Sequence, residues 1–244
     1  MTTPGGKTVY GAGLGILMLN TRFPRIPGDI GHAGTWPFPV QYKVVTDATP
    51  DNVVRGDAGP LLEAFVAAGR ELVDLGCDGI ATNCGFLAPF QDEMTAALNV
   101  PVAASSLLQW PMIARALPQG RSVGILTISS ETLTPAHLDA AGIPQGTPVA
   151  GTGATSHFTQ AVLGDAGEID FAQARADNVA AAQRLVSERP DVGAILLECT
   201  NMVPYAADIR RATGRPVFSI YTHLVWFQSA LLPRRFSSDL DDPR

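Results

Sequence analysis

The chain has 244 residues, of which 46% are hydrophobic and 16% are charged. Because domains average roughly 100–200 residues, this length fits one large domain or two small ones with enough apolar material for a buried core. The formal net charge of −6 argues against nucleic acid as a partner, since proteins that bind it usually present a basic face.

The N-terminal apolar run and the cysteines bear on the cellular compartment. No run reaches the roughly 20 apolar residues of a membrane-spanning helix, so no membrane partner is expected. Glycines interrupt residues 9–19 and no small-residue cleavage site follows, which favours a buried first strand over a signal peptide. Cys77, Cys84 and Cys199 are too few, and odd in number, for a disulfide framework. We therefore expect free thiols in a cytoplasmic protein.

Short apolar runs alternate along the chain with amphipathic stretches of helical period. This alternation predicts an α/β fold with mainly parallel sheets, covered on both faces and joined by right-handed crossovers. The predicted strands are 14–19, 79–82, 102–104, 122–128, 194–197 and 217–220. The predicted helices are 59–75, 86–98, 106–116, 171–188 and 205–213. Residues 20–57 are rich in proline and glycine, and we interpret them as a lid or site loop; residues 146–153 are predicted to form a second loop.

An internal repeat is the most informative feature of the chain. Residues 78–105 align with residues 193–220 without a gap, at a constant offset of 115 residues (84 to 199), so that Cys84 falls on Cys199. Pro89 likewise falls on Pro204. Each copy reads strand, cysteine turn, helix, short loop and strand, which predicts two similar halves related by a pseudo-two-fold axis. We assign residues 1–118 and 219–244 to a lobe with Cys84, and residues 119–218 to a lobe with Cys199.

The repeat indicates a particular chemistry. Ligands of parallel sheets bind beyond the carboxyl ends of the strands, and both cysteines follow a predicted strand directly. If the lobes face each other, one thiolate can remove a proton from a carbon while the opposite thiol returns one. Such an inversion needs no cofactor. The histidines and cysteines show no metal-ligand spacing, so no metal is expected.

Polar residues beside the cysteines suit a carboxylate ligand. Each cysteine opens a predicted helix, whose N-terminus can lower the pKa of a thiol and stabilise an anion. The candidate substrate-binding residues are Thr82, Asn83 and Gly85 around the first cysteine, Thr200 and Asn201 after the second, Asn20 and Arg22 after the first strand, and Ser129 after its counterpart. The side chains of several of these could equally serve as helix caps.

The two cysteine segments resemble a known family. Residues 79–85 (GIATNCG) and 196–204 (LLECTNMVP) are similar to the two cysteine motifs of the aspartate/glutamate racemase superfamily. That group includes amino-acid and hydantoin racemases, maleate isomerases and arylmalonate decarboxylases. The resemblance implies two Rossmann-like lobes with the active-site cleft between them, catalytic roles for Cys84 and Cys199, and neither pyridoxal phosphate nor metal.

Two positions depart from the glutamate racemase pattern. Those enzymes read Cys-Asn-Thr at the first motif, where this chain reads Thr82, Asn83 and Cys84, so either Thr82 or Cys84 occupies the first catalytic position. The repeat favours Cys84. Glutamate-type racemases also carry an acidic residue after the first strand, whereas this chain has Asn20 and Arg22 nearby. Arg22 would suit a second carboxylate or a ureido oxygen.

Three functions follow in order of preference. The first is a cofactor-independent racemase that inverts a carbon α to a carboxylate or carbonyl of an amino acid or hydantoin. The second is a decarboxylase or cis–trans isomerase of a small dicarboxylic acid that uses one of the two cysteines. The third is a non-catalytic small-acid binding protein, since a fold alone does not define a function. Each has a small carboxylate or hydantoin as partner and is compatible with a homo-oligomer.

Overall fold

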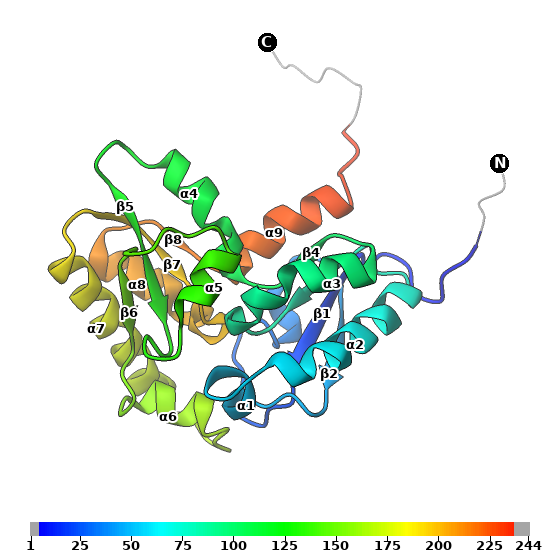
Figure 1. Cartoon of the computed structure of the whole chain (residues 1–244), viewed down its shortest axis with the longest axis horizontal. Coiled ribbons are helices and arrows are strands. Elements are labelled where there is room, and N and C mark those ends of the chain that lie inside the picture. The colour runs from blue at the N-terminus through cyan, green and yellow to red at the C-terminus, as the bar shows by residue number, and fades with distance from the viewer. Residues whose placement is uncertain (1–4, 237–244) are drawn as a thin grey trace, which may run out of the picture.

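The computed structural model describes residues 5–236, which form two lobes, each built on a four-stranded parallel sheet (Figure 1). The first sheet has the order β2 (Val40–Val45), β1 (Leu14–Leu19), β3 (Gly79–Thr82) and β4 (Val102–Ala103). The second has the order β6 (Val149–Gly151), β5 (Ser122–Thr127), β7 (Val192–Leu197) and β8 (Val217–Phe218). The two sheets repeat one strand order, which confirms the predicted α/β class with two similar lobes.

Helices flank both sheets in Figure 1. The α-helices are α1 (Pro50–Val54), α2 (Leu62–Asp74), α3 (Gln91–Leu98), α4 (Trp110–Ala116), α5 (Pro135–Ala140), α6 (His157–Leu163), α7 (Phe171–Glu188), α8 (Ala206–Thr213) and α9 (Ile220–Leu231). The 3₁₀ helices are η1 (Ala33–Thr35), η2 (Gly59–Leu61), η3 (Gly85–Phe90), η4 (Ser106–Gln109) and η5 (Thr200–Tyr205). Within the described residues, no helix combines the length and the apolar character needed to cross a bilayer.

The central strands and the edge strands β4 and β8 lie at the predicted positions, whereas the edge strands β2 and β6 were not predicted as strands. Every residue of β1 and β3 is buried, as expected for continuous apolar runs covered on both faces. The segments predicted as loops, 20–57 and 146–153, in fact contain the edge strands β2 and β6. Most residues of these two strands are only partly buried. An edge strand has one neighbour and an open side, so its sequence need not form an apolar run.

Several helices also differ from the prediction. The bounds of α7 agree with the expected 171–188. The expected helix 86–98 begins as the 3₁₀ helix η3, which contains Pro89, and becomes α-helical only at α3. Proline lacks an N–H and cannot sustain the i→i−4 ladder of an α-helix. The short helices α1, α5 and α6 and the longer α9 were not predicted.

The internal repeat is reproduced in three dimensions at the same offset of 115 residues. Shifted by this number, the bounds of η3, α3 and β4 coincide with those of η5, α8 and β8. Even the residues after the two equivalent helices match in conformation: Asn99 and Gly214 are left-handed, with φ of 55° and 68°. Asparagine and glycine are the residues that adopt this conformation most readily at a helix C-terminus.

Each sheet is followed in the chain by a helix that packs against the other sheet. Helix α4 follows the first sheet in the chain but contacts β5 of the second sheet, and α9 follows the second sheet but contacts β3 of the first. Ile220 and Leu224 of α9 share a hydrophobic cluster with Leu14 and Ile16 of β1. The C-terminal helix therefore packs on the first lobe, to which we assign 219–244; residues beyond 236 lie outside the described part.

Candidate active site

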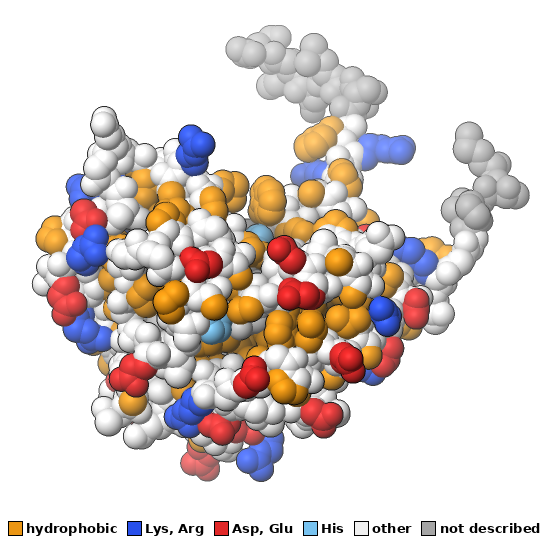
Figure 2. All heavy atoms as spheres, in the orientation of Figure 1, with side chains coloured by type: hydrophobic (Ala, Val, Ile, Leu, Met, Phe, Trp, Pro, Cys, Tyr) orange, Lys and Arg blue, Asp and Glu red, His pale blue; other side chains and the backbone are white. Residues whose placement is uncertain are grey.

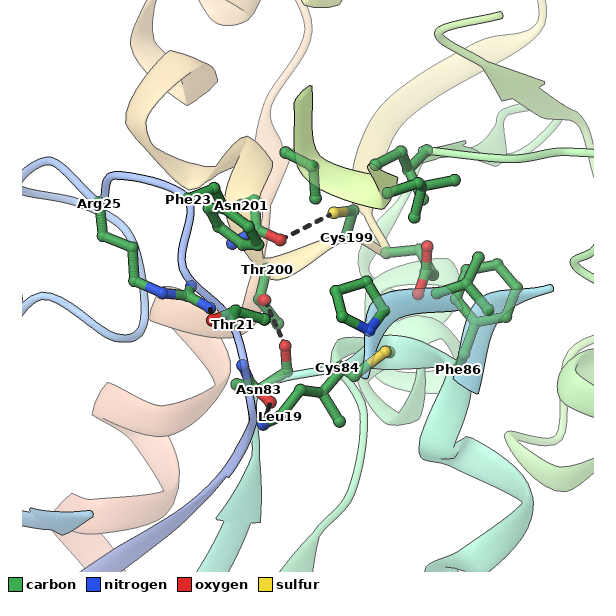
Figure 3. A pocket seen from close by; sticks show the side chains of 17 residues that line it. Leu19, Thr21, Phe23, Arg25, Asn83, Cys84, Phe86, Cys199, Thr200 and Asn201 are labelled. Carbon is green, nitrogen blue, oxygen red and sulfur yellow. Dashed lines mark hydrogen bonds between the residues drawn. The ribbon is translucent and has the colours of Figure 1, made fainter. Parts of the chain in front are cut away.

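A pocket opens where the carboxyl ends of β1, β3, β5 and β7 converge from the two lobes (Figure 3). It holds about 370 Å³ of empty space, counting the part open to solvent at its mouth. Most of its walls are apolar, and a few polar groups face inward. The lining residues are Leu19, Thr21, Phe23, Arg25, Pro50, Val54, Asn83, Cys84, Gly85, Phe86, Ile128, Val162, Leu163, Glu198, Cys199, Thr200 and Asn201.

Both cysteines of the repeat line this pocket. Cys84 immediately precedes η3, and Cys199 immediately precedes η5, so the two thiols occupy equivalent positions in the two lobes. Each side chain is almost fully buried, with 8% exposure. A backbone N–H two residues further on, that of Phe86 for Cys84 and that of Asn201 for Cys199, lowers the pKa of each thiol in part. The pseudo-symmetry of the fold thus brings two equivalent thiols to one cavity.

Burial governs the acidity of these thiols. It raises the pKa of both Cys84 and Cys199 above the usual range, and the neighbouring Glu198 carboxylate raises it further. The backbone N–H groups lower the pKa of each thiol only in part. The sequence predicts that the helix starts favour thiolates, and the structure shows why burial outweighs them: η3 and η5 are 3₁₀ segments of only six residues, and both thiols are almost fully buried.

A chain of hydrogen bonds orients the sulfur of Cys199. Its Sγ donates to Asn201 Oδ1 at 3.6 Å (Figure 3), and Asn201 Nδ2 donates to Asp29 Oδ2 at 2.7 Å. Asp29 Oδ1 in turn accepts from Arg25 Nη1 at 2.6 Å, and Arg25 Nη2 donates to Thr21 Oγ1 at 2.9 Å. These groups come from both lobes, so closing the lobes on each other assembles the chain.

Other polar residues near the thiols tie the lobes together. Thr200 Oγ1 donates to the carbonyl of Asn83 at 2.6 Å, across the junction of the lobes, and Ser106 Oγ donates to the carbonyl of Leu197 at 2.7 Å. Asn83 Oδ1 accepts from the N–H of Leu19 at 2.8 Å (Figure 3). The two thiols therefore lie at a junction between the lobes that these hydrogen bonds hold rigid.

The structure places six of the predicted site residues around the pocket and one just behind it. Those that line it are Cys84, Cys199, Asn83, Gly85, Thr200 and Asn201. Thr82 does not line it. The hydroxyl of Thr82 is fully buried and donates to the carbonyl of Ala104 at 2.6 Å. Of Thr82 and Cys84, the two candidates for the first catalytic position, Cys84 is thus the one that lines the pocket.

Three predicted residues lie elsewhere. The side chain of Asn20 is exposed and donates to the carbonyl of Thr46. Arg22 is 81% exposed and pairs with Asp165 of the other lobe, so it is at the surface. Ser129 lines a neighbouring surface hollow. The chain turns sharply after β1, which directs Thr21 and Arg25 inward in their place.

Of Thr21, Phe23, Arg25 and Glu198, the sequence singles out neither Phe23 nor Arg25, and it leaves Thr21 and Glu198 undecided between a role in the site and none. The first three lie in the segment interpreted as a site loop, which predicts their region but not which side chains face inward. Glu198 carries a usable signal, since it directly precedes a cysteine and directly follows the apolar strand β7. A lone carboxylate at such a position is costly to bury unless it has a role.

Asp165, just after α6, joins the two lobes next to the pocket-lining residue Phe23. Its carboxylate accepts hydrogen bonds from the backbone N–H groups of Arg22 and Phe23 and from Arg22 Nε. Partial burial raises the pKa of Asp165, but these hydrogen bonds outweigh that effect and hold it below its usual range. Helices α1 and α6 contact each other beside it. The two lobes therefore meet at the pocket mouth as well as at its floor.

We expect Asp165→Asn to destabilise the protein by about 1 kcal/mol at neutral pH, because the charge-assisted hydrogen bonds are lost. A carboxyl with a lowered pKa stabilises the fold above its ordinary pKa, and this contribution disappears as the pH falls through the folded-state value. The midpoints of urea unfolding of wild type and variant should therefore approach each other as the pH falls. A difference between the two midpoints that stays the same from pH 7 to a pH below the folded-state pKa of Asp165 would contradict this role.

The face of the molecule drawn in Figure 2 carries no field of one sign. Acidic and basic side chains are interspersed around the outline of this face, and hydrophobic side chains gather across its middle. Among the described residues, no group of three or more histidines, cysteines or acidic residues is arranged to hold a metal ion.

The fold and the paired cysteines define a two-lobed α/β protein with a thiol-lined pocket at its pseudo-two-fold junction. Residues 58–227 match the family model described as Asp/Glu/hydantoin racemase, and the chain belongs to this family. It is 29% identical over 225 residues to a dimethylsulfoniopropionate lyase of Durusdinium sp. clade D, covering 88% of this chain and 74% of the relative. It is 30% identical over 230 residues to dimethylsulfoniopropionate lyase 7 of Emiliania huxleyi (strain CCMP1516), covering 90% and 67%.

Solved structures share the fold. A Gly74Cys mutant of arylmalonate decarboxylase superposes with a TM-score of 0.61 at 17% identity, covering 93% of this chain and 97% of that one. The aspartate racemase of Picrophilus torridus superposes with a TM-score of 0.56 at 13% identity, covering 93% and 96%. A decarboxylase and a racemase therefore share the fold of this chain.

Proposed function

We propose that this chain is a lyase that removes the proton α to the carboxylate of a small acid and expels a substituent from the β carbon. The observation that carries the proposal is the placement of both repeat cysteines, Cys84 and Cys199, on one buried pocket. The relatives that cover most of the chain are named lyases of dimethylsulfoniopropionate, so this β-sulfonium acid is the substrate to test first. The expectation of a racemase is retained as the second candidate.

The elimination balances without a cofactor. A thiolate takes the α proton and becomes a thiol, the C–H electron pair forms the Cα=Cβ double bond, and the Cβ–S bond breaks with its electrons on sulfur. The products are dimethyl sulfide and acrylate. Because dimethyl sulfide leaves as a neutral molecule, its departure needs no acid. One base is therefore enough for elimination, whereas inversion at carbon needs a second group on the opposite face.

We assign the role of base to Cys199. A proton-transferring group must be held in position before its pKa matters, and the Asn201–Asp29–Arg25 chain fixes the direction of the Cys199 sulfur. The raised thiol pKa means that the reactive thiolate is scarce at neutral pH. Turnover is therefore expected to increase with pH over the neutral and mildly alkaline range.

The pocket offers partners for the substrate carboxylate on its first-lobe side. The Arg25 guanidinium lines the cavity and is already oriented by Asp29 and Thr21. The amide of Asn83 is fixed through its oxygen, which leaves Nδ2 available as a donor. A carboxylate held by these donors would also carry the enolate charge that develops as the α proton leaves.

The second candidate, a racemase of an amino acid or hydantoin, is favoured by the equivalence of the two thiols. Each sulfur has the same position before a 3₁₀ helix and the same type of backbone donor. That symmetry suits removal of a proton on one face and its return on the other. In the segment after β1, where glutamate-type racemases carry an acidic residue, the charged side chain that lines the pocket is that of Arg25.

Proton NMR in heavy water tests both candidates with the purified chain. With dimethylsulfoniopropionate we expect acrylate and dimethyl sulfide to appear in equal amounts. Amino acids and hydantoins that gain deuterium at Cα, without new products, would instead support the racemase. If neither elimination nor exchange occurs, both candidates fail. Binding of the same acids without turnover would then indicate a small-acid binding protein.

A further inference from the structure

Glu198 is a fully buried carboxyl whose two oxygens differ. Its Oε2 accepts a hydrogen bond from Thr127 Oγ1 at 2.6 Å, while Oε1 is buried and has no hydrogen-bond partner within the described residues. The residue lines the pocket between the two thiols. A side chain at position 85 would overlap Oε1, so Gly85 makes the room that this oxygen needs. An unpartnered oxygen is expensive in a dry cavity and indicates a missing partner.

The charges around the pocket show what kind of partner is missing. Arg25 and Asp29 neutralise each other as an ion pair with 2.6 Å between their atoms. The thiols stay protonated because burial raises the pKa of both. Burial likewise raises the pKa of Tyr205, the last residue of η5, to about 12.

The remaining elements around Glu198 add no charge. Burial lowers the pKa of His137, which packs on Phe86 from α5 and is therefore neutral. Helices α1 and α6 contribute apolar residues, among them Val54 and Val162. Among the described residues that line the pocket, the Glu198 carboxylate is thus the negative charge without a counter-ion.

We propose that Glu198 selects zwitterionic acids, with the cationic substituent of the substrate lying beside the Glu198 carboxylate group while the substrate carboxylate faces Arg25 and Asn83. The inference rests on the proposed function and names the residue that decides its substrate class. A sulfonium or quaternary ammonium group carries no N–H and needs only an electrostatic partner, which an unpaired carboxylate oxygen supplies. The aromatic rings of Phe23 and Phe86, both in the pocket wall, suit the alkyl groups of such a cation.

This arrangement predicts opposite pH behaviour for two kinds of ligand. Burial raises the pKa of Glu198 to about 7, although the Thr127 hydrogen bond lowers it in part. A simple monoanionic acid binds well only when Glu198 is protonated, so its affinity should fall about tenfold per pH unit above 7. A zwitterion instead favours the carboxylate form, so its affinity should increase as the pH rises through 7 and then remain constant.

Isothermal titration of an isosteric ligand pair tests the proposal. Dimethylsulfonioacetate and 3-methylbutanoate have nearly the same shape and differ in the permanent cation, and neither has a β leaving group. At pH 8.5 we expect wild type to prefer the zwitterion by about 30-fold, the effect of one and a half pH units above the pKa of Glu198. At pH 6 the preference should largely disappear.

Two variants separate charge recognition from a structural role. Glu198→Gln keeps the shape and the hydrogen bond with Thr127, and we expect it to lose both the preference for the zwitterion and the pH dependence while still binding 3-methylbutanoate. Thr127→Val keeps the carboxylate and removes the hydrogen bond that lowers its pKa. In that variant the preference should persist, with its onset shifted to higher pH.

The inference is overturned if Glu198→Gln retains the zwitterion preference, or if wild type binds both ligands equally at pH 8.5. Because neither ligand can undergo β-elimination, the result does not depend on turnover. If dimethylsulfoniopropionate is not cleaved but the preference is found and is lost in Glu198→Gln, charge selection by this residue stands and the proposed reaction has to be replaced.

Discussion

Serine in place of Cys199 is expected to lower the turnover of dimethylsulfoniopropionate by about 10²–10⁴-fold, the usual contribution of a general base. A hydroxyl is far less acidic than a thiol, so it cannot supply the base even when the geometry is kept. The sulfur it replaces is the one that Asn201, Asp29 and Arg25 hold in place. Release of dimethyl sulfide measured by gas chromatography, with acrylate quantified in parallel, gives the comparison.

Cys84→Ser is the matched variant, because Cys84 occupies the equivalent position with the same 8% exposure. For an elimination we expect it to retain turnover within about tenfold of wild type, since the neutral sulfide leaves without an acid. Equal losses in both variants would favour inversion by two thiols. Full activity in Cys199→Ser would refute the assignment of the base.

Alanine in place of Gly85 is the second change with a large expected effect. The added methyl group would overlap both Oε1 and the backbone carbonyl oxygen of Glu198. Gly85 does not have a positive φ, so the effect comes from this contact and not from backbone strain. We expect a loss of stability of about 1–3 kcal/mol, typical of overpacking in a rigid core. Displacement of the Glu198 carboxylate should also lower turnover by at least about tenfold.

Gly167→Ala is the control for that variant. Gly167 also lacks a positive φ, and a methyl group there would meet no atom within 4 Å. We expect wild-type turnover and a midpoint of urea unfolding unchanged or slightly raised, since alanine restricts the unfolded chain. Equal behaviour of the two variants in urea unfolding and in turnover would show that the close approach of Glu198 to position 85 has no consequence.

Burial on both faces made some elements recognisable in the sequence, and its absence hid others. The fully buried central strands were recognised because strands covered on both faces read as apolar runs. The edge strands β2 and β6 were not, since partly exposed strands carry mixed residues. Helices α1 and α6 have only five and seven residues, which is too short to show a clear helical period. These missed elements include two that contribute pocket walls, through Val54 and Val162. The sequence therefore identified the strand ends that meet at the pocket but not the helices α1 and α6 that complete its wall.

The predicted residues around the pocket divide in the same way. Asn83, Gly85, Thr200 and Asn201 lie beside the cysteines in the chain, so short-range position was enough to bring them to the cavity. Arg22 was selected over its neighbour Arg25 on position alone. The turn after β1 sends Arg22 outward to Asp165 and Arg25 inward to Asp29. Which of two nearby arginines faces a cavity depends on contacts with the other lobe.

The sequence by itself determined the two-lobed architecture and the pairing of Cys84 with Cys199, because a duplicated strand-and-helix unit is a local pattern that survives in the order of residues. Tertiary structure alone decided the electrostatics of the pocket. The acidity of the thiols and of Glu198 depends chiefly on burial, and for Cys199 also on the charges of Glu198 and of the distant Asp29. Solvent exclusion at the junction of two lobes is a property of the assembled fold and has no signature in any single stretch of chain.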